Sequence, residues 1–113
     1  LWGTGNPRRE FVFSEDIADA IVFLLEKNYN TTMEPINIGS GKDISILDLA
    51  ELIAQEVGFA GQITWEKDKP DGAMQKLLDI NKIKELGWYP STKLSNGIAA
   101  TYTWYKKSIG FID

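Results

Sequence analysis

Leu1-Trp2-Gly3-Thr4-Gly5-Asn6-Pro7-Arg8-Arg9-Glu10-Phe11-Val12-Phe13 is the stretch on which the chain is organised, and it predicts a loop followed by a short strand. Its glycines and proline favour the loop, and residues 9–13 have the composition of a strand. The indole of Trp2 suits a base or a sugar, and the planar guanidinium of Arg9 suits a phosphate. The stretch therefore indicates a site for an anionic ligand that carries a ring.

The same residues also have a purely structural interpretation. In that interpretation Trp2 packs on the core, Arg8 lies at the surface, and Arg9 forms an exposed ion pair with Glu10, which would contribute little stability. Lys76 also has two interpretations, because it precedes apolar residues and follows a Pro-Asp-Gly loop. It is either a charge at a strand edge or a second phosphate partner.

Composition limits the possible functions. The chain has 113 residues, 43% of them hydrophobic and 25% charged, which is typical of one soluble globular domain. Its net charge of −4 argues against a general nucleic-acid or anionic-membrane surface. It contains no Cys and no His, so disulfides, thiolate chemistry and the commonest metal ligand are missing. No apolar run has the length of a membrane span, and because the first residue is Leu, we expect a piece of a longer protein.

The sequence pattern predicts an α/β (mixed α+β) fold with about four helices and several short strands. Helices are expected from Ser14 to Lys27-Asn28, from Ser45 to Val57, from Asn81 to Leu86 and from about Ser95 to Ser108. Extended pieces are expected at Arg9–Phe13, Pro35–Ile38, Gln62–Glu66 and Lys76–Asp79, with Tyr29–Glu34 as a connector.

Helix ends and apolar stripes support these assignments. Ser14 is expected to cap the first helix, and Ser45 with Asp48 forms a capping-box pattern at the second, which Gly58 ends. The expected buried stripes are Ile17, Ile21, Leu24 and Leu25 in the first helix, Ile46, Leu49, Ala50, Ile53 and Val57 in the second, and Leu94, Ile98, Tyr102, Tyr105 and Ile109 in the last.

Gly39-x-Gly41 lies between a predicted strand and a predicted helix, so it invites comparison with a dinucleotide-binding loop. That fingerprint needs a third glycine and a helix that begins at the loop itself. Here the third position is Ile44, and the helix is expected to begin only at Ser45. A simple strand-to-helix turn is the better interpretation.

Two Tyr-x-x-x-Lys spacings, Tyr102 with Lys106 and Tyr89 with Lys93, match the pair that lowers a tyrosine pKa in short-chain dehydrogenases. Tyr102 belongs to the apolar stripe of the last helix, and Tyr89 is followed by a proline, so packing explains both better. The acid pairs Glu15-Asp16 and Asp68 with Asp71 fit a first helical turn and a solvated turn. We expect no catalytic residue and no metal site among them.

Several blocks of the sequence, in order, carry a family resemblance. They are Trp2–Phe11, Asp16–Ala18, Ile36–Gly41, Lys69–Gly72, Lys76–Asp79 and Leu86–Trp88. Together they resemble the C-terminal part of the GDP-L-fucose synthase family, a branch of the extended short-chain dehydrogenase/reductases that act on nucleotide sugars. The Ile-Asn-Ile-Gly and Pro-Asp-Gly blocks are general to the superfamily, whereas the first block and Lys-Leu-Leu-Asp are more particular to this branch.

The resemblance implies a role for the whole chain. Residues 1–113 would be the C-terminal substrate-binding lobe of an enzyme that converts GDP-4-keto-6-deoxy-mannose to GDP-L-fucose by epimerisation and NADPH reduction. Trp2, Arg9 and Lys76 match family positions that bind the nucleotide-sugar, with the two cations near the diphosphate. The cofactor loop and the catalytic residues would belong to a preceding NADP-binding Rossmann domain, so this chain would bind no NADPH and would be inactive alone.

Further expectations follow from the same resemblance. The partners would be a GDP-sugar and the missing Rossmann domain, with no nucleic acid and no membrane, and the protein would be cytoplasmic. Because that domain would normally cover strand edges and helix faces, we expect the isolated chain to self-associate, as a homodimer or by exchange of segments. Two alternatives stay open: the lobe of another nucleotide-sugar enzyme, acting on a UDP- or dTDP-sugar, and a non-catalytic binding module.

Overall fold

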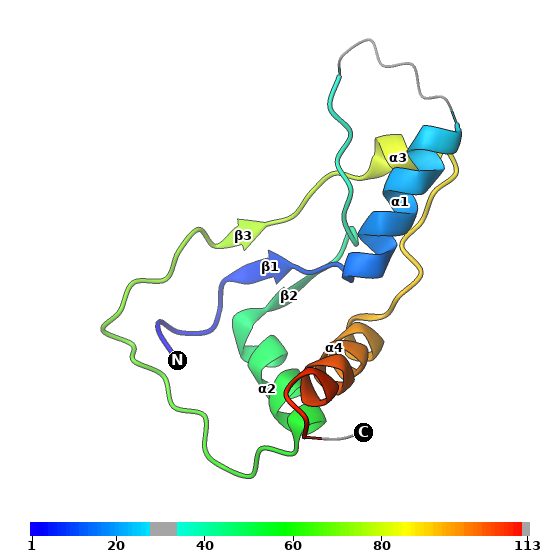
Figure 1. Cartoon of the computed structure of the whole chain (residues 1–113). Coiled ribbons are helices and arrows are strands. Elements are labelled where there is room, and N and C mark those ends of the chain that lie inside the picture. The colour runs from blue at the N-terminus through cyan, green and yellow to red at the C-terminus, as the bar shows by residue number, and fades with distance from the viewer. Residues whose placement is uncertain (28–33, 112–113) are drawn as a thin grey trace.

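The computed structural model describes residues 1–27 and 34–111, which form four helices and a small mixed sheet. The helices are α1 (Ser14–Glu26), α2 (Ile46–Val57), α3 (Asn81–Glu85) and α4 (Leu94–Ser108), and the strands are β1 (Arg8–Glu10), β2 (Asp43–Ser45) and β3 (Gln75–Lys76). β1 is the central strand, antiparallel to β2 and parallel to β3 (Figure 1). The expected mixed α+β fold is confirmed.

Two predicted extended pieces do not form strands. Residues 35–38 are irregular, and residues 62–66 make only one parallel bridge, between Trp2 and Glu66. The apolar alternation at 62–66 is real, since Ile63 and Trp65 are partly buried between exposed neighbours, but the sheet does not extend to this segment. The first predicted strand is shorter than expected, because β1 ends at Glu10. Of the predicted connector, residues 29–33 lie outside the described residues.

The helix ends agree with the sequence pattern in α2 but not in α1. The Ser45 side chain accepts a hydrogen bond from the Asp48 amide at 3.0 Å, and Gly58 ends α2 with a φ of 70°, as expected. The prediction that Ser14 caps α1 was wrong. Phe13 holds the cap position, and its carbonyl accepts the first helical hydrogen bond, from Ile17 at 3.2 Å.

The buried core is small and lies where α1, α3 and the following loop meet. Its members are Ala20, Ile80, Ile83 and Trp88, with the partly buried Phe23, Leu24, Ile36 and Ile38 against them. The predicted stripe of α1 was therefore wrong in part, because Ile21 is 49% exposed and Leu25 is 72% exposed. The face of α1 that packs is rotated toward Asp16, Ala20 and Phe23, because α3 lies on that side.

Asp16 fastens α1 to the segment that leads into α4. Its carboxylate is buried and accepts hydrogen bonds from the Ser91 hydroxyl and from the amide and hydroxyl of Thr92, all at 2.9–3.0 Å. Burial raises the pKa of Asp16, but the hydrogen bonds from Thr92 and Ser91 outweigh burial and hold that pKa below its ordinary value. One turn along α1, Asp19 accepts from the Trp88 indole at 2.8 Å. From the sequence, Asp16 was predicted to favour the helix dipole, and no pattern indicated its contacts with Ser91 and Thr92.

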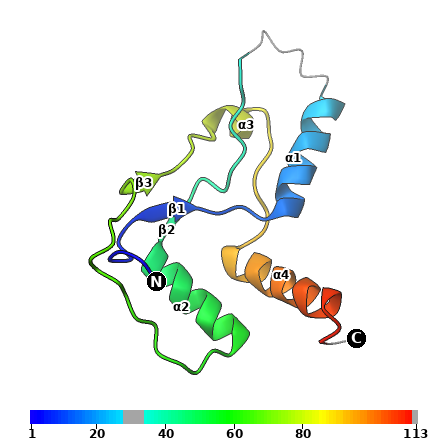
Figure 2. The same cartoon turned by 60° about the vertical axis from the view of Figure 1, so that its left-hand side comes forward.

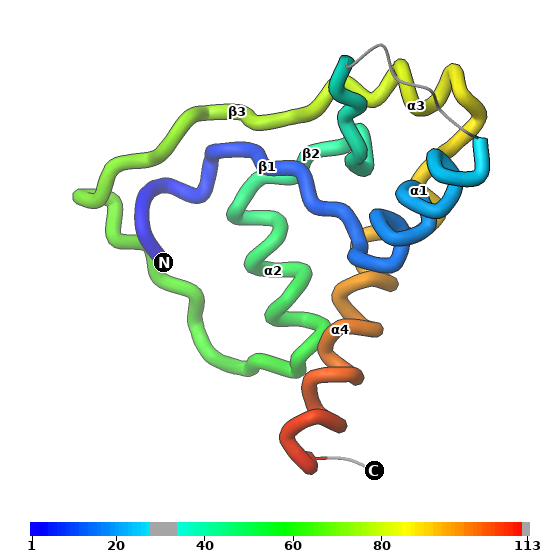
Figure 3. Tube along the Cα trace, turned by 45° about the horizontal axis from the view of Figure 1, so that its top comes forward, coloured from blue at the N-terminus to red at the C-terminus, as the bar shows by residue number. Residues whose placement is uncertain are grey.

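The chain is flat and extended for its size. Its principal dimensions are 50 × 40 × 18 Å and its radius of gyration is 17.1 Å, whereas a compact domain of this length has about 13 Å. α2 and α4 lie beside one another, and in Figures 2 and 3 both are separated from α3. Apolar side chains from this pair and from β1's C-terminal end line an open groove of about 580 Å³. No helix among the described residues is long and apolar enough to cross a membrane.

The small core makes Ile83 a sensitive position. Replacing this fully buried side chain by alanine, Ile83→Ala, should lower the free energy of unfolding by about 2–5 kcal/mol, because the change leaves a cavity beside Trp88. Ile21→Ala is the matched control on the exposed side of α1 and should cost less than about 1 kcal/mol. Urea unfolding followed by circular dichroism measures both. Equal losses in the two variants would contradict this description of the core.

Candidate functional site

The first nine residues run beside residues 64–76, and backbone contacts join the two segments at both ends. The Glu66 amide donates to the Leu1 carbonyl at 2.7 Å, and the Gly3 amide donates to the Glu66 carbonyl at 3.0 Å. At the other end the Arg8 amide donates to the Met74 carbonyl at 2.8 Å, where β1 meets β3. This pairing brings the opening loop and the Lys76 segment together in space (Figure 3).

A side-chain contact joins the same segments between these ends. The Thr4 amide donates to Asp71 Oδ1 at 2.8 Å, and the Thr4 hydroxyl donates to Asp71 Oδ2 at 2.6 Å. Gly3 has a φ of 77°, and a Cβ at that position would overlap Asp71 Oδ1. The two donors on Thr4 hold the pKa of Asp71 below its ordinary value. Sequence analysis assigned Asp71 to a solvated turn and gave Thr4 no role.

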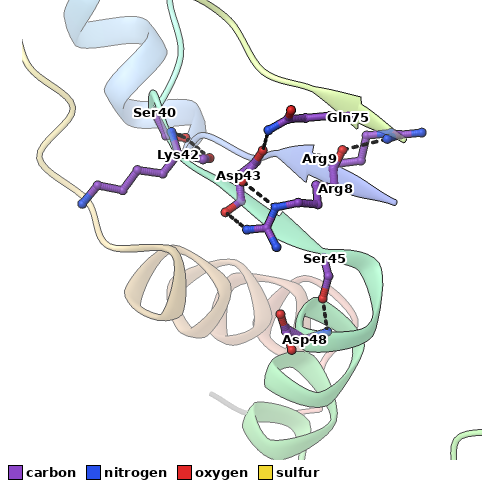
Figure 4. A network of polar contacts seen from close by, with 8 residues as sticks. All are labelled: Arg8, Arg9, Ser40, Lys42, Asp43, Ser45, Asp48 and Gln75. Atoms are coloured by element: carbon purple, nitrogen blue, oxygen red, sulfur yellow. Dashed lines mark hydrogen bonds and ion pairs between the residues drawn. The ribbon is translucent and has the colours of Figure 1, made fainter. Parts of the chain in front are cut away.

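Arg8 and Arg9 differ because consecutive strand residues face opposite sides of the sheet. Arg8 forms an ion pair with Asp43, in which Nε lies 2.8 Å from Oδ1. The side-chain amide of Gln75 also donates to the Asp43 carboxylate (Figure 4). Hydrogen bonds from Gln75 and Arg8 hold the pKa of Asp43 below its ordinary value. Figure 4 shows Arg9 extending away from this network.

Arg9 lies beside Lys76 on the other face of the sheet. The two residues are register partners in the parallel pairing of β1 and β3, so their side chains leave the sheet on the same side. Nη1 of Arg9 donates to the carbonyls of Arg8 and Ala73, both at 2.7 Å. Within residues 1–27 and 34–111, the ion pairs are Arg8–Asp43 and Lys82–Glu34, so neither Arg9 nor Lys76 has a carboxylate partner. Two cations therefore occupy neighbouring positions on one face of the sheet, and neither has a carboxylate partner in these residues.

Trp2 lies farther along the same loop and is 72% exposed. Its backbone bridges Glu66, and the ammonium of Lys69 lies 5.8 Å from the centre of its ring, within cation–π range. Packing of Trp2 on the core, the structural alternative, is excluded by this exposure. The alternative Arg9–Glu10 ion pair is also wrong, because the Glu10 carboxylate is bound elsewhere.

Glu10 closes the Gly39–Gly41 turn. The Gly41 amide donates to Glu10 Oε1 at 2.6 Å, the Ser40 hydroxyl donates to the same atom at 3.3 Å, and the Leu78 amide donates to Oε2 at 2.9 Å. A carboxylate of the chain therefore holds the position that a phosphate would need at this turn. The residues here do not fit a dinucleotide pyrophosphate, which agrees with the interpretation of a structural turn. Sequence analysis did not assign this role to Glu10.

The two Tyr-x-x-x-Lys spacings have different surroundings in the structure. Lys106 lies 4.6 Å from the centre of the Tyr102 ring, so it packs over the ring face one helical turn away. Tyr89 is 62% exposed and lies outside the helices, so the expectation that Tyr89 packs against the core was wrong. The described part of the chain contains no group of three or more Asp, Glu, His or Cys that could hold a metal ion.

Comparisons with known proteins find a family model and several relatives that match this chain. Residues 1–39 match the NAD dependent epimerase/dehydratase family. GDP-L-fucose synthase 1 of Arabidopsis thaliana is 47% identical over 96% of this chain, and the match covers 33% of that protein. The chain spans about a third of the length of the curated relatives it matches.

Solved structures of nucleotide-sugar enzymes are similar to this chain over most of its length. The GDP-mannoheptose C4 reductase of Campylobacter jejuni, with NADP bound, is 37% identical over 94% of this chain and 34% of its own, with a TM-score of 0.80. UDP-glucose 4-epimerase of Thermotoga maritima, with UDP-glucose, is 26% identical over 96% of this chain and 35% of its own, with a TM-score of 0.83. The resemblance drawn from the ordered sequence blocks is confirmed by these matches.

The Thr4–Asp71 contact predicts a titration that can be measured. Thr4→Val removes the hydroxyl donor, so the pKa of Asp71 should rise toward its ordinary value of 3.8. Because the folded-state pKa is the lower one, the contact stabilises the fold above about pH 4 and is lost as the pH falls through the folded-state value. Carboxyl ¹³C NMR titration measures the shift. Thr103→Val, on α4, is the control; an unchanged Asp71 pKa in Thr4→Val would contradict the contact.

Proposed function

We propose that this chain, a relative of the GDP-L-fucose synthases within the NAD-dependent epimerase/dehydratase superfamily, is the C-terminal substrate-binding lobe of a nucleotide-sugar enzyme. Its ligand is a GDP-sugar. The observation that carries the proposal is the pairing of Arg9 with Lys76 on one face of the sheet, because neither cation has a carboxylate partner in the described residues. A diphosphate supplies the negative charge that the pair lacks.

The three predicted binding residues have separate roles in this proposal. Arg9 and Lys76 hold the diphosphate: the two carbonyls that fix Nη1 of Arg9 orient its guanidinium without neutralising its charge. Trp2 presents an exposed ring on the loop that precedes β1, where it can contact a base or a sugar. Lys69, whose ammonium lies over the Trp2 ring in this structure, would move away or share the ring with the ligand. The pocket is completed by residues outside this chain.

The parent enzyme in this proposal converts GDP-4-keto-6-deoxy-mannose to GDP-L-fucose by epimerising two carbons and reducing the ketone with NADPH. Two of the relatives are GDP-L-fucose synthases, which supports that reaction, and one related structure contains NADP. The proposal assigns no catalytic residue to residues 1–113 and places NADPH on the preceding domain. When bound, NADPH supplies hydride there. This chain alone is then an inactive, ligand-binding part.

The surfaces of the chain support a partner domain. Large apolar side chains are exposed on α1, α4 and β3's flanks, among them Val22, Leu25, Leu77 and Trp104. A Rossmann domain of the same cytoplasmic polypeptide covers part of this surface in the proposal, and in its absence the chain self-associates or forms a homodimer. A lobe specific for a UDP-sugar is the second candidate, because a UDP-glucose 4-epimerase shares this fold at 26% identity.

Nucleotide titration tests the binding role. Arg9→Ala and Lys76→Ala should each weaken GDP binding by about 10-fold or more, because each removes a charge-assisted phosphate contact. Isothermal calorimetry with GDP, UDP and dTDP measures affinity and preference. Lys107→Ala, in the last turn of α4, is the matched control, since it removes one positive charge from a helix outside the small sheet. Equal affinity for GDP in all variants would refute the assignment, and a preference for UDP would support the second candidate.

The residues that precede Leu1 in the gene test the enzyme assignment. We expect that sequence to encode a Gly-rich cofactor loop, a Ser and a Tyr-x-x-x-Lys pair, because residues 1–113 are assigned no catalytic or cofactor-binding role. Sequencing the locus upstream of codon 1 makes the measurement. A reading frame that opens at this chain, or that continues into an unrelated domain, would favour the non-catalytic binding module.

A further inference from the structure

We propose that Thr4 and Asp71 are positioning residues, which hold the Trp2 loop in register with the strand that carries Lys76 and thereby shape the site for the nucleoside diphosphate. This inference rests on the proposed function and adds two residues to its binding site. Neither residue touches the ligand in this proposal. They act through Trp2, Arg9 and Lys76.

The need for such a contact follows from how little else joins the two segments. β3 consists of only Gln75 and Lys76, so its ladder with β1 is two residues long. Between that ladder and the bridge at Glu66, the loop of residues 67–73 has no backbone hydrogen bond to residues 1–9. The Asp71 carboxylate fills this gap with two hydrogen bonds to Thr4, of 2.8 and 2.6 Å. The Thr4 hydroxyl also accepts from the Asn6 amide at 3.2 Å, which ties the contact to the turn before Pro7.

The contact reaches Arg9 through the residues that follow Asp71. A Cβ at Gly72 would lie 3.2 Å from Nη2 of Arg9, and the Ala73 carbonyl accepts from Nη1 at 2.7 Å. The position of Asp71 therefore sets where this backbone meets the guanidinium. On the other side, Gly3 packs directly against the Asp71 carboxylate, so the same contact sets the backbone next to Trp2.

Charge also favours a positioning role over direct ligand binding. A carboxylate repels a diphosphate, so Asp71 is unsuited to direct contact with the ligand. Both Asp71 oxygens accept from Thr4, and Arg9 is held by carbonyls and not by Asp71. The Thr4–Asp71 contact therefore holds the loop in place, and the positive charge of Arg9 stays available to the ligand.

The test compares variants that break the contact with variants that keep it. Thr4→Val keeps the side-chain shape but loses the hydroxyl, and Asp71→Ala loses both acceptors; each should weaken GDP binding about 5- to 10-fold, as calorimetry measures. Thr4→Ser and Asp71→Asn should bind within about 2-fold of the unaltered chain. Serine restores the hydroxyl, and the asparagine amide can accept from the Thr4 amide and donate to the hydroxyl. Thr103→Val, exposed on α4, is the control for the lost hydroxyl.

Amide hydrogen exchange supplies a second readout that general destabilisation does not reproduce. In Thr4→Val and Asp71→Ala, exchange should rise for the Gly3 and Thr4 amides, while Trp88 in the core stays protected. Unchanged GDP affinity in both variants, or a failure of serine and asparagine to restore it, would overturn the inference while leaving the proposed function intact. If Thr4→Val loses core protection as well, Asp71→Ala decides by the same criteria. A chain that binds no GDP while Trp88 stays protected would overturn both.

Discussion

The candidate site depends on β1, because the pleat of this strand turns its three residues to alternate faces of the sheet. Arg8 and Glu10 leave one face, where Arg8 pairs with Asp43 and Glu10 accepts from the Gly41 and Leu78 amides. Arg9 leaves the opposite face beside Lys76. A shift of one residue in register would turn each of these side chains to the opposite face of the sheet. Arg9 would then lie on the face of Asp43, and Arg8 would lie on the face of Lys76. The contacts of Arg8 and Glu10 thus fix the register that exposes Arg9.

The fold around this strand has little core of its own. Four buried apolar side chains at α1 and α3 cannot by themselves bury the remaining apolar surface, and the molecule is only 18 Å thick in its shortest dimension. Hydrogen bonds to carboxylates supplement this small core. Asp16 accepts from Thr92 and Asp19 accepts from Trp88, so the segment before α4 is held against α1. Polar contacts of this kind depend on precise geometry, whereas the groove between α2 and α4 is still open to an apolar partner.

The sequence was sufficient for features that depend on local chemistry. The Ser45 cap, the Gly58 end of α2, the four helices and the fold class all follow from patterns within a few residues. Features that depend on distant partners were missed or misassigned: the packed face of α1 depends on α3, and Gln62–Glu66 lacks a strand partner despite its alternation. For the site, residue type suggested Arg9 and Lys76, and the family resemblance grouped them near a diphosphate, whereas the register of β1 with β3 shows that they are neighbours in the sheet.

An acidic chain can still present a cationic site, because the carboxylates near that site are already occupied. Asp43 accepts from Arg8 and Gln75, Asp71 from Thr4, and Glu10 from backbone amides. Each of these acids is held by donors of the chain, so none pairs with Arg9 or Lys76. The net charge of −4 describes the average surface, whereas binding of an anion depends on local pairing. Composition therefore argues against a general polyanion surface, yet it carries no information about two neighbouring cations that lack a carboxylate partner among the described residues.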